Sequence, residues 1–188
     1  KGAGSLLNQL ASKDQNIAIE KGPDGTFYPI APSEVIARLN NLVQSEMTTE
    51  HYFTLVYATV HLQTGKITAA QAGHPYPLVQ RKNGDVEAVG TGGLPVGLVP
   101  DARYEQFDVR LQKGDRMIIF SDGVPECMSE TGAFFDDENL VNFMRDWKRK
   151  RGPNFLDGLL FELDRFAGSR DFSDDISAIL LEFEGNSV

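Results

Sequence analysis

The spacing of the apolar residues changes twice along the chain, and this change constrains the fold more than any other feature. Residues 33–46 repeat apolar side chains at the helical period. From about residue 52 to residue 120 the apolar residues alternate, with many β-branched and aromatic types, and helical spacing returns at 137–149 and 154–167. Helices grouped around a run of strands predict an α+β protein with antiparallel sheets, not an alternating parallel fold.

Turn signals divide the alternating region into strands. The predicted strands cover residues 52–62, 67–72, 77–81, 85–89, 104–110 and 115–120, with a last strand at 176–183. Asn83-Gly84 is a strong hairpin signal, and the strands before residue 120 are expected to follow one another as an antiparallel meander. A helix is expected at 5–12 and a loop at 13–29, with its turn at Pro23-Asp24-Gly25.

Length and charge exclude several classes of protein. The 188 residues predict one domain, 1–188, and the formal net charge of −9 leaves no basic surplus for nucleic acid. No stretch approaches the roughly 18 apolar residues of a membrane span, so no membrane partner is predicted. The one cysteine, Cys127, cannot form an intrachain disulfide, which fits a cytoplasmic location. Because the sequence does not begin with Met, we expect it to be part of a longer protein.

Two groups of carboxylates stand where apolar strands begin or end. Asp122 follows the strand Met117–Phe120 and precedes Gly123, whereas Asp174 and Asp175 directly precede the last strand. Taken singly, each group is more simply explained as an ordinary turn or a solvated loop. Together they match the oxygen ligands that Mg²⁺ and Mn²⁺ prefer, and two bridged ions could activate a water against a phosphoryl group.

Other catalytic schemes find little support in the sequence. The three histidines lack the HExxH spacing, and the sequence contains no G-x-S-x-G elbow and no phosphate-binding glycine loop. Gly73 and His74 stand in a short segment between two predicted strands, followed by the glycine-rich stretch 92–97. These glycines either allow close backbone approach beneath a site or form two tight loops in which His74 is an ordinary hydrogen-bonded side chain.

Taken in order, the motifs resemble the metal-dependent protein phosphatase (PPM) family, in its SpoIIE-type branch of bacterial serine/threonine phosphatases. The resemblance runs from Lys1 to about Leu181. Its motifs are Phe53-Thr54-Leu55-Val56-Tyr57-Ala58, Thr64-Gly65-Lys66, Ala72-Gly73-His74-Pro75, Gly93-Leu94-Pro95-Val96-Gly97, Phe120-Ser121-Asp122-Gly123-Val124-Pro125-Glu126, Phe134-Phe135 and Asp174-Asp175-Ile176-Ser177.

The resemblance implies an α-β-β-α sandwich of two antiparallel sheets flanked by helices. It implies that Asp122 and Asp174 are catalytic metal ligands for Mn²⁺ or Mg²⁺, with Gly123, Asp175, Gly73 and His74 in supporting positions. The implied reaction is hydrolysis of phosphoserine or phosphothreonine by a metal-activated water, without a covalent intermediate.

The family's first metal motif is Asp-x-x-Gly-His/Lys-Gly, and Lys1-Gly2 matches only its last two positions. The bridging aspartate, which would bring the number of ions to two, is therefore expected upstream of Lys1, together with the first strands of the sandwich. The implied substrate is a phosphorylated anti-sigma-factor antagonist of the STAS type. A receiver or sensor domain, as in bacterial response regulators and two-component signal transduction, is expected upstream in the same polypeptide, and the domain is a candidate homodimer.

Two other functions stay open at this stage. One is a noncatalytic PPM-fold interaction module with an incomplete metal site, and the other is a small-molecule phosphoesterase, because a fold does not determine a substrate. The basic run Lys148–Arg151 could recognise an acidic partner, but a solvated helix C-terminus explains it more simply.

Overall fold

The structure, a computed structural model, describes residues 17–46 and 52–185, which fall into two compact units. Of the described residues, the first unit contains those up to Val60 with residues 67–74 and 90–108, and the second contains residues 61–66, 75–89 and 109–185. The predicted helix at 5–12 lies outside the described residues. No helix of the described part is long and apolar enough to cross a bilayer.

In the first unit a helix covers a three-stranded sheet. The helix is α2 (Pro32–Glu46), and the sheet has the order β3 (Leu55–His61), β4 (Lys66–Ala72), β7 (Gln106–Arg110), apart from a few end residues that belong to the second unit. The apolar positions that predicted the helix form its buried face, where Ile36, Leu39 and Val43 pack with Ala70 and Ala72 of β4.

The predicted loop at 13–29 is wrong in part, because it contains a short hairpin of β1 (Ile19–Lys21) and β2 (Phe27–Pro29). Its turn lies where Pro23-Asp24-Gly25 predicted it, and Asp24 accepts hydrogen bonds from the backbone N–H and the hydroxyl of Thr26, both at 3.0 Å. The two strands have three residues each and almost no buried side chains, so they show none of the alternation that identifies a strand in the sequence.

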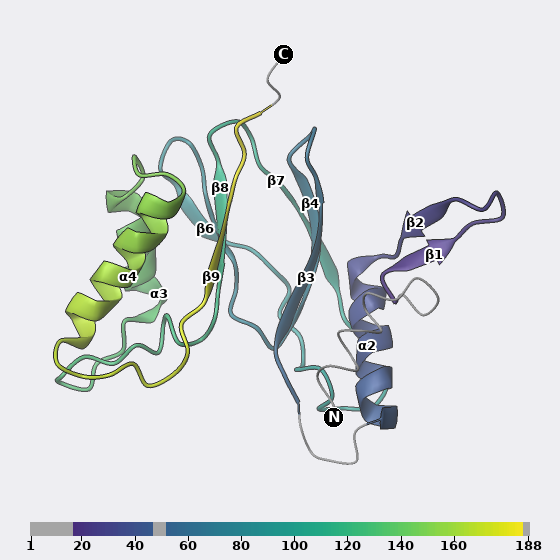
Figure 1. The fold of residues 1–188 in the computed structure, drawn as a ribbon, viewed down its shortest axis with the longest axis horizontal. Coiled ribbons are helices and arrows are strands. Elements are labelled where there is room, and N and C mark those ends of the chain that lie inside the picture. Colours follow the sequence, from purple (N-terminus) through teal and green to yellow (C-terminus); the bar gives the residue numbers. More distant parts are fainter. Residues whose placement is uncertain (1–16, 47–51, 186–188) are drawn as a thin grey trace. The chain divides into compact units, whose positions relative to one another are not determined.

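In the second unit two helices cover a four-stranded antiparallel sheet. The sheet has the order β6 (Val86–Ala88), β5 (Leu78–Gln80), β8 (Arg116–Phe120), β9 (Ala178–Glu182). The helices are α3 (Asp136–Asp146) and α4 (Pro153–Ala167), and Figure 1 shows both against one face of the sheet. Ile118 and Phe120 of β8 pack there with Leu140 of α3 and Leu163 of α4, so the core of this unit lies directly beneath the strand that leads to Asp122.

The α+β prediction is confirmed, but the single meander is wrong. Asn83-Gly84 does join the hairpin of β5 and β6, whereas the turn Lys113-Gly114-Asp115 joins β7 and β8, which belong to different sheets. Alternation and turn residues locate strands but do not specify pairing, because pairing depends on contacts between residues distant in the sequence.

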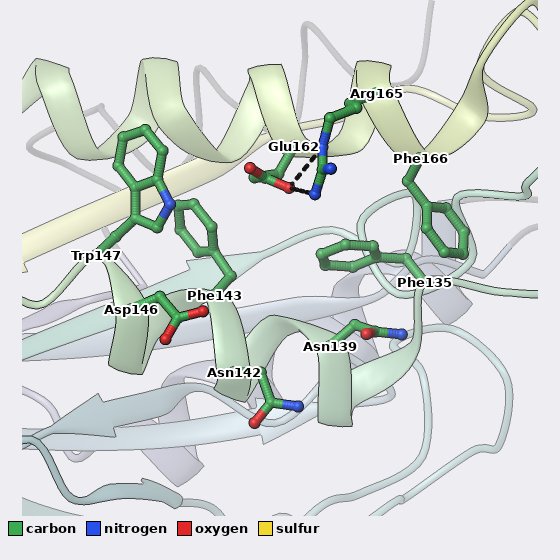
Figure 2. Close-up of a pocket in the computed structure, with 9 residues that line it drawn as sticks. All are labelled: Phe135, Asn139, Asn142, Phe143, Asp146, Trp147, Glu162, Arg165 and Phe166. Atoms are coloured by element: carbon green, nitrogen blue, oxygen red, sulfur yellow. Dashed lines mark hydrogen bonds and ion pairs between the residues drawn. The ribbon is translucent and has the colours of Figure 1, made fainter.

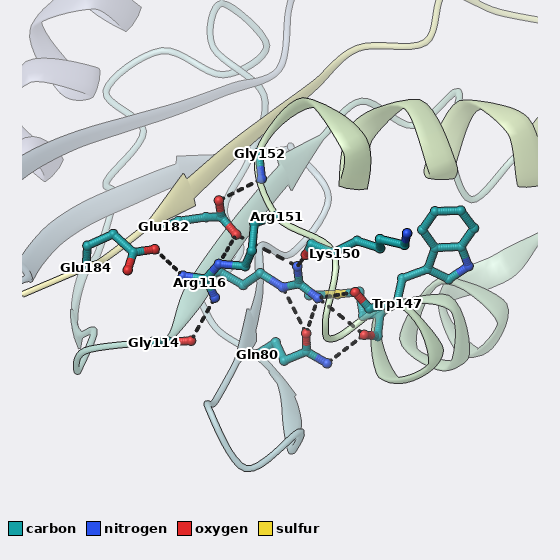
Figure 3. Close-up of polar contacts among 10 residues, drawn as sticks. Gln80, Gly114, Arg116, Trp147, Lys150, Arg151, Gly152, Glu182 and Glu184 are labelled. Carbon is teal, nitrogen blue, oxygen red and sulfur yellow. Dashed lines mark hydrogen bonds and ion pairs between the residues drawn. The ribbon is translucent and has the colours of Figure 1, made fainter.

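A buried arginine fixes the connection between α3 and α4 to the sheet (Figure 3). Arg116 of β8 is 1% exposed, and its Nε and Nη1 donate hydrogen bonds to Gln80 Oε1 at 2.8 Å and to the Lys150 carbonyl at 2.7 Å. Its guanidinium carbon lies 3.9 Å from the centre of the Phe155 ring. Burial lowers the pKa of Arg116 to about 10, although nearby Glu182 raises it.

Candidate metal centre

The two segments that carry the candidate carboxylates lie side by side where β8 ends and β9 begins. Phe120, the last residue of β8, pairs with Ala178, the first residue of β9. The chain leaving β8 and the chain entering β9 therefore lie at the same edge of an antiparallel sheet. Ser121 continues the pairing beyond the strands, since its backbone N–H donates to the Ser177 carbonyl at 2.9 Å. This pairing brings the loop of Asp122 against the segment that carries Asp174 and Asp175.

Gly123 shows how closely these two segments approach. A Cβ at this position would lie 2.5 Å from the Asp175 carbonyl oxygen and 3.5 Å from that of Asp174. No side chain fits at such distances, because the obstacle is backbone. Gly123 is therefore required by the close packing of the two segments, and its supporting role in a metal site stays a prediction.

Each of the two main carboxylates uses one oxygen within its own loop. Asp122 Oδ1 accepts the Gly123 N–H at 3.1 Å, and Asp174 Oδ1 accepts the Asp175 N–H at 2.7 Å. Both side chains are exposed, and neither Oδ2 has a hydrogen-bond donor among the described residues. Each exposed carboxylate thus keeps one oxygen for which the described residues supply no donor, and carboxylate oxygens are the donors that Mg²⁺ and Mn²⁺ take.

The donor set fits part of a metal coordination sphere. Nowhere within residues 17–46 and 52–185 do three His, Cys, Asp or Glu side chains gather closely enough to hold an ion. An ion at Asp122 and Asp174 would therefore need further oxygen donors, such as carbonyl groups or water. The carboxylate of Asp175, also exposed, does not complete a group of three.

Gly73 and His74 belong to the first unit, whereas the carboxylates belong to the second. Gly73 has a φ of +67°, its N–H donates to the Gly93 carbonyl at 2.9 Å, and a Cβ would lie 2.6 Å from Pro95 Cγ. The Gln71 side-chain amide donates to the His74 carbonyl. These contacts explain why a tight loop forms there, and the supporting role of Gly73 and His74 in a metal site stays a prediction.

A separate groove lies between α3 and α4 in the second unit (Figure 2). Its volume is about 450 Å³, and the stacked rings of Phe143 and Trp147 and the edge-to-face rings of Phe135 and Phe166 line its two ends. Glu162 and Arg165 form an ion pair at 2.6 Å along the α4 side. None of the predicted site residues lines this groove.

Comparison with solved structures identifies the fold of the chain. The SiaA-PP2C domain of Pseudomonas aeruginosa aligns with a TM-score of 0.72 at 18% identity, over 81% of this chain and 61% of that one. The phosphatase domain of SpoIIE from Bacillus subtilis, presoaked with Mn, aligns with a TM-score of 0.65 at 22% identity, over 98% of this chain and 73% of that one. The fold is therefore that of PP2C-type phosphatase domains, as the sequence predicted.

Sequence comparison gives the family. The family model "Stage II sporulation protein E (SpoIIE)" matches residues 3–184, and this chain belongs to that family. Phosphoserine phosphatase RsbU of Bacillus subtilis (strain 168) is 36% identical over 149 residues, which are 77% of this chain and 44% of RsbU. The chain thus spans less than half the length of this curated relative.

Proposed function

We propose that this chain is the catalytic domain of a metal-dependent protein serine/threonine phosphatase. One observation carries the proposal: in a chain of the SpoIIE family, the Asp122 loop and the Asp174–Asp175 segment meet at one edge of a sheet, with Gly123 packed against the Asp175 carbonyl. The name of RsbU, a phosphoserine phosphatase, supports the same activity.

In this proposal Asp122 and Asp174 would hold Mn²⁺ or Mg²⁺. An ion bound there would supply an activated water and would offset the negative charge of a phosphoryl group. Gly123 keeps the two carboxylate segments in backbone contact, and Asp175 anchors Asp174 through its N–H. The exposure of both carboxylates suits a substrate as large as a protein, because no lid of described residues covers them.

The proposed substrate is a phosphorylated regulatory protein of the STAS anti-sigma-factor antagonist type. We also propose that the same polypeptide contains a receiver or sensor domain and that the phosphatase domain forms a dimer. The match covers only 44% of RsbU, so more than half of that relative lies outside the matched region, which supports the proposal of a further domain. The net charge of −9 argues against nucleic acid as a partner, and the one cysteine, Cys127, free and buried, is consistent with the cytoplasm.

A noncatalytic interaction module is the second candidate. The observation that favours it is that the described residues contain no group of three His, Cys, Asp or Glu side chains that could hold a metal ion. Without further ligands, two carboxylates would bind a divalent cation weakly. The groove between α3 and α4 would then be the natural surface for a partner.

Phosphate release from a phosphoserine STAS-domain protein, measured with and without Mn²⁺ in the full-length polypeptide, distinguishes the two candidates. We expect Mn²⁺-dependent release that falls about a hundredfold or more in Asp122→Asn, because removal of a ligand costs more than the loss of a group that orients one. Asp157→Asn, which removes an exposed carboxylate on α4, is the matched control and should keep full activity.

Full activity in Asp122→Asn would overturn the proposal. A folded wild-type protein that releases no phosphate would favour the interaction module. Faster turnover of free phosphoserine than of the phosphoprotein would favour a small-molecule phosphoesterase.

A further inference from the structure

Ser121 connects the two carboxylate segments through its side chain. Its hydroxyl accepts the Ser177 N–H at 2.9 Å and donates to the Asp175 carbonyl at 3.0 Å. A hydroxyl has one proton to donate and lone pairs to accept with, so both bonds can form together. This one side chain therefore hydrogen-bonds to the backbone of both residues that flank Ile176.

Two residues contact the Asp175 carbonyl. Ser121 donates a hydrogen bond to it and Gly123 packs against it, and Asp122 stands between these two in the chain. The N–H of the same residue, Asp175, donates to the Asp174 carboxylate. The position of Asp122 relative to Asp174 is thus set by the contacts that its two neighbours make with one peptide.

We propose that Ser121 is a positioning residue for the metal centre, and this inference rests on the proposed function. By binding the Asp175 carbonyl and the Ser177 N–H, its hydroxyl holds the backbone that carries Asp122 against the backbone that carries Asp174 and Asp175. Ser121 binds no ion itself. Its effect reaches the metal through the geometry of the two carboxylates.

A purely structural role for Ser121 makes a different prediction. If the hydroxyl only extended the pairing of β8 and β9, its loss would lower stability and leave metal affinity unchanged in the folded protein. Groups that orient metal ligands typically change affinity about 10- to 100-fold when they are removed. Metal affinity, measured beside thermal stability, therefore separates the two roles.

The test is calorimetric titration of the full-length protein with Mn²⁺ alone, together with a thermal melt of each variant without metal. We expect Ser121→Ala to bind Mn²⁺ at least about tenfold more weakly while it remains folded at the titration temperature. Ser121→Thr, which keeps the hydroxyl, should restore most of the affinity. Ser129→Ala is the matched control, because Ser129 also accepts a backbone N–H, from Ala133 at 3.1 Å, but in a turn outside the carboxylate pair.

Wild-type affinity in Ser121→Ala would overturn the inference, and so would an equal loss in Ser129→Ala or a failure of Ser121→Thr to restore binding. Asp122→Asn separates this inference from the proposed function. If Asp122→Asn abolishes Mn²⁺ binding while Ser121→Ala binds normally, only the positioning role fails. If the wild type binds no Mn²⁺, the proposed function fails and the positioning role fails with it.

Discussion

At the scale of single residues, Arg116 is the largest side chain that the described part of the chain buries completely. Its Nη2 also reaches Gln80 Oε1 and the carbonyls of Met144 and Trp147, the last two at 3.4 and 3.3 Å (Figure 3). These carbonyls lie in the last turn of α3 and just after its end, where a helix leaves its last carbonyl groups without partners within the helix. Arg116 therefore acts as a cap for α3 that is supplied by the sheet.

We expect Arg116→Met to destabilise the protein by about 3 kcal/mol, because Gln80 Oε1 and the Lys150 carbonyl lose the donor that Arg116 supplies. Urea unfolding followed by the fluorescence of Trp147, the one tryptophan of the chain, measures this change close to the substitution. Arg145→Met, on the exposed side of α3, is the control and should change stability by less than about 0.5 kcal/mol. An Arg116→Met protein as stable as the wild type would show that the cost of burying the charge cancels its hydrogen bonds.

The sequence indicates the carboxylates but not the residues that hold them. Asp122 and Asp174 are recognisable because each adjoins a long apolar run, which is a local pattern. Arg116 and Ser121 act on residues 36 and 54 positions away in the chain, and no local pattern reports such a contact. Both were present in the sequence with no role predicted.

At the scale of elements, Asp115 joins the hairpin of β5 and β6 to the turn before β8. Its Oδ1 accepts the Lys82 N–H at 2.9 Å, and its Oδ2 accepts the Gln112 N–H at 2.9 Å and an Arg81 Nη1 proton at 3.0 Å. Burial raises the pKa of Asp115, but these hydrogen bonds and the charge of Arg81 outweigh burial and hold the pKa below its ordinary value of 3.8. The charged carboxylate is thus favoured by the folded state.

A carboxyl group whose pKa is lower in the folded than in the unfolded state stabilises the folded protein at pH values above the unfolded-state pKa. This stabilisation is lost as the pH falls through the folded-state pKa. We expect Asp115→Asn to lower the free energy of unfolding by about 1–2 kcal/mol at pH 7, because a side-chain amide cannot accept all of these hydrogen bonds. The difference from wild type should shrink as the pH falls below about 4, where the unfolded carboxyl begins to be protonated. Urea unfolding at pH 3, 4, 5 and 7 checks this, with the exposed Asp137→Asn as control. An equal difference at pH 3 and pH 7 would contradict it.

Predictability also differs between elements. Helices α2, α3 and α4 lie within a few residues of their predicted ranges, because each has an apolar stripe that faces a sheet. The β1–β2 hairpin and the division of the strands between two sheets were not predicted. The hairpin has almost no buried face to give it a pattern, and strand pairing is settled by long-range contacts.

At the scale of the whole molecule, each unit has its own apolar core, and neither core includes the candidate carboxylates. The first core includes Ile36, Leu39 and Val43 of α2. The second core includes Ile118 and Phe120 of β8 with apolar side chains of α3 and α4. Asp122 and Asp174 are exposed at the edge of a sheet that is already hydrogen-bonded and packed. The fold is therefore stabilised without an ion, unlike small domains in which metal binding supplies the folding free energy.

Removal of metal should consequently abolish activity without unfolding the protein. After chelation with EDTA we expect an unchanged far-ultraviolet circular dichroism spectrum, no phosphate release, and a lower thermal midpoint than with Mn²⁺. An ion that binds only the folded state stabilises it by about 2.7 kcal/mol at a hundredfold excess over its Kd, so Mn²⁺ should raise the midpoint as its concentration rises. Asp122→Asn should lack this rise, since the ion would have lost one of its two proposed carboxylates. Collapse of the spectrum on chelation would contradict the prediction, because it would make the metal a structural part of the fold.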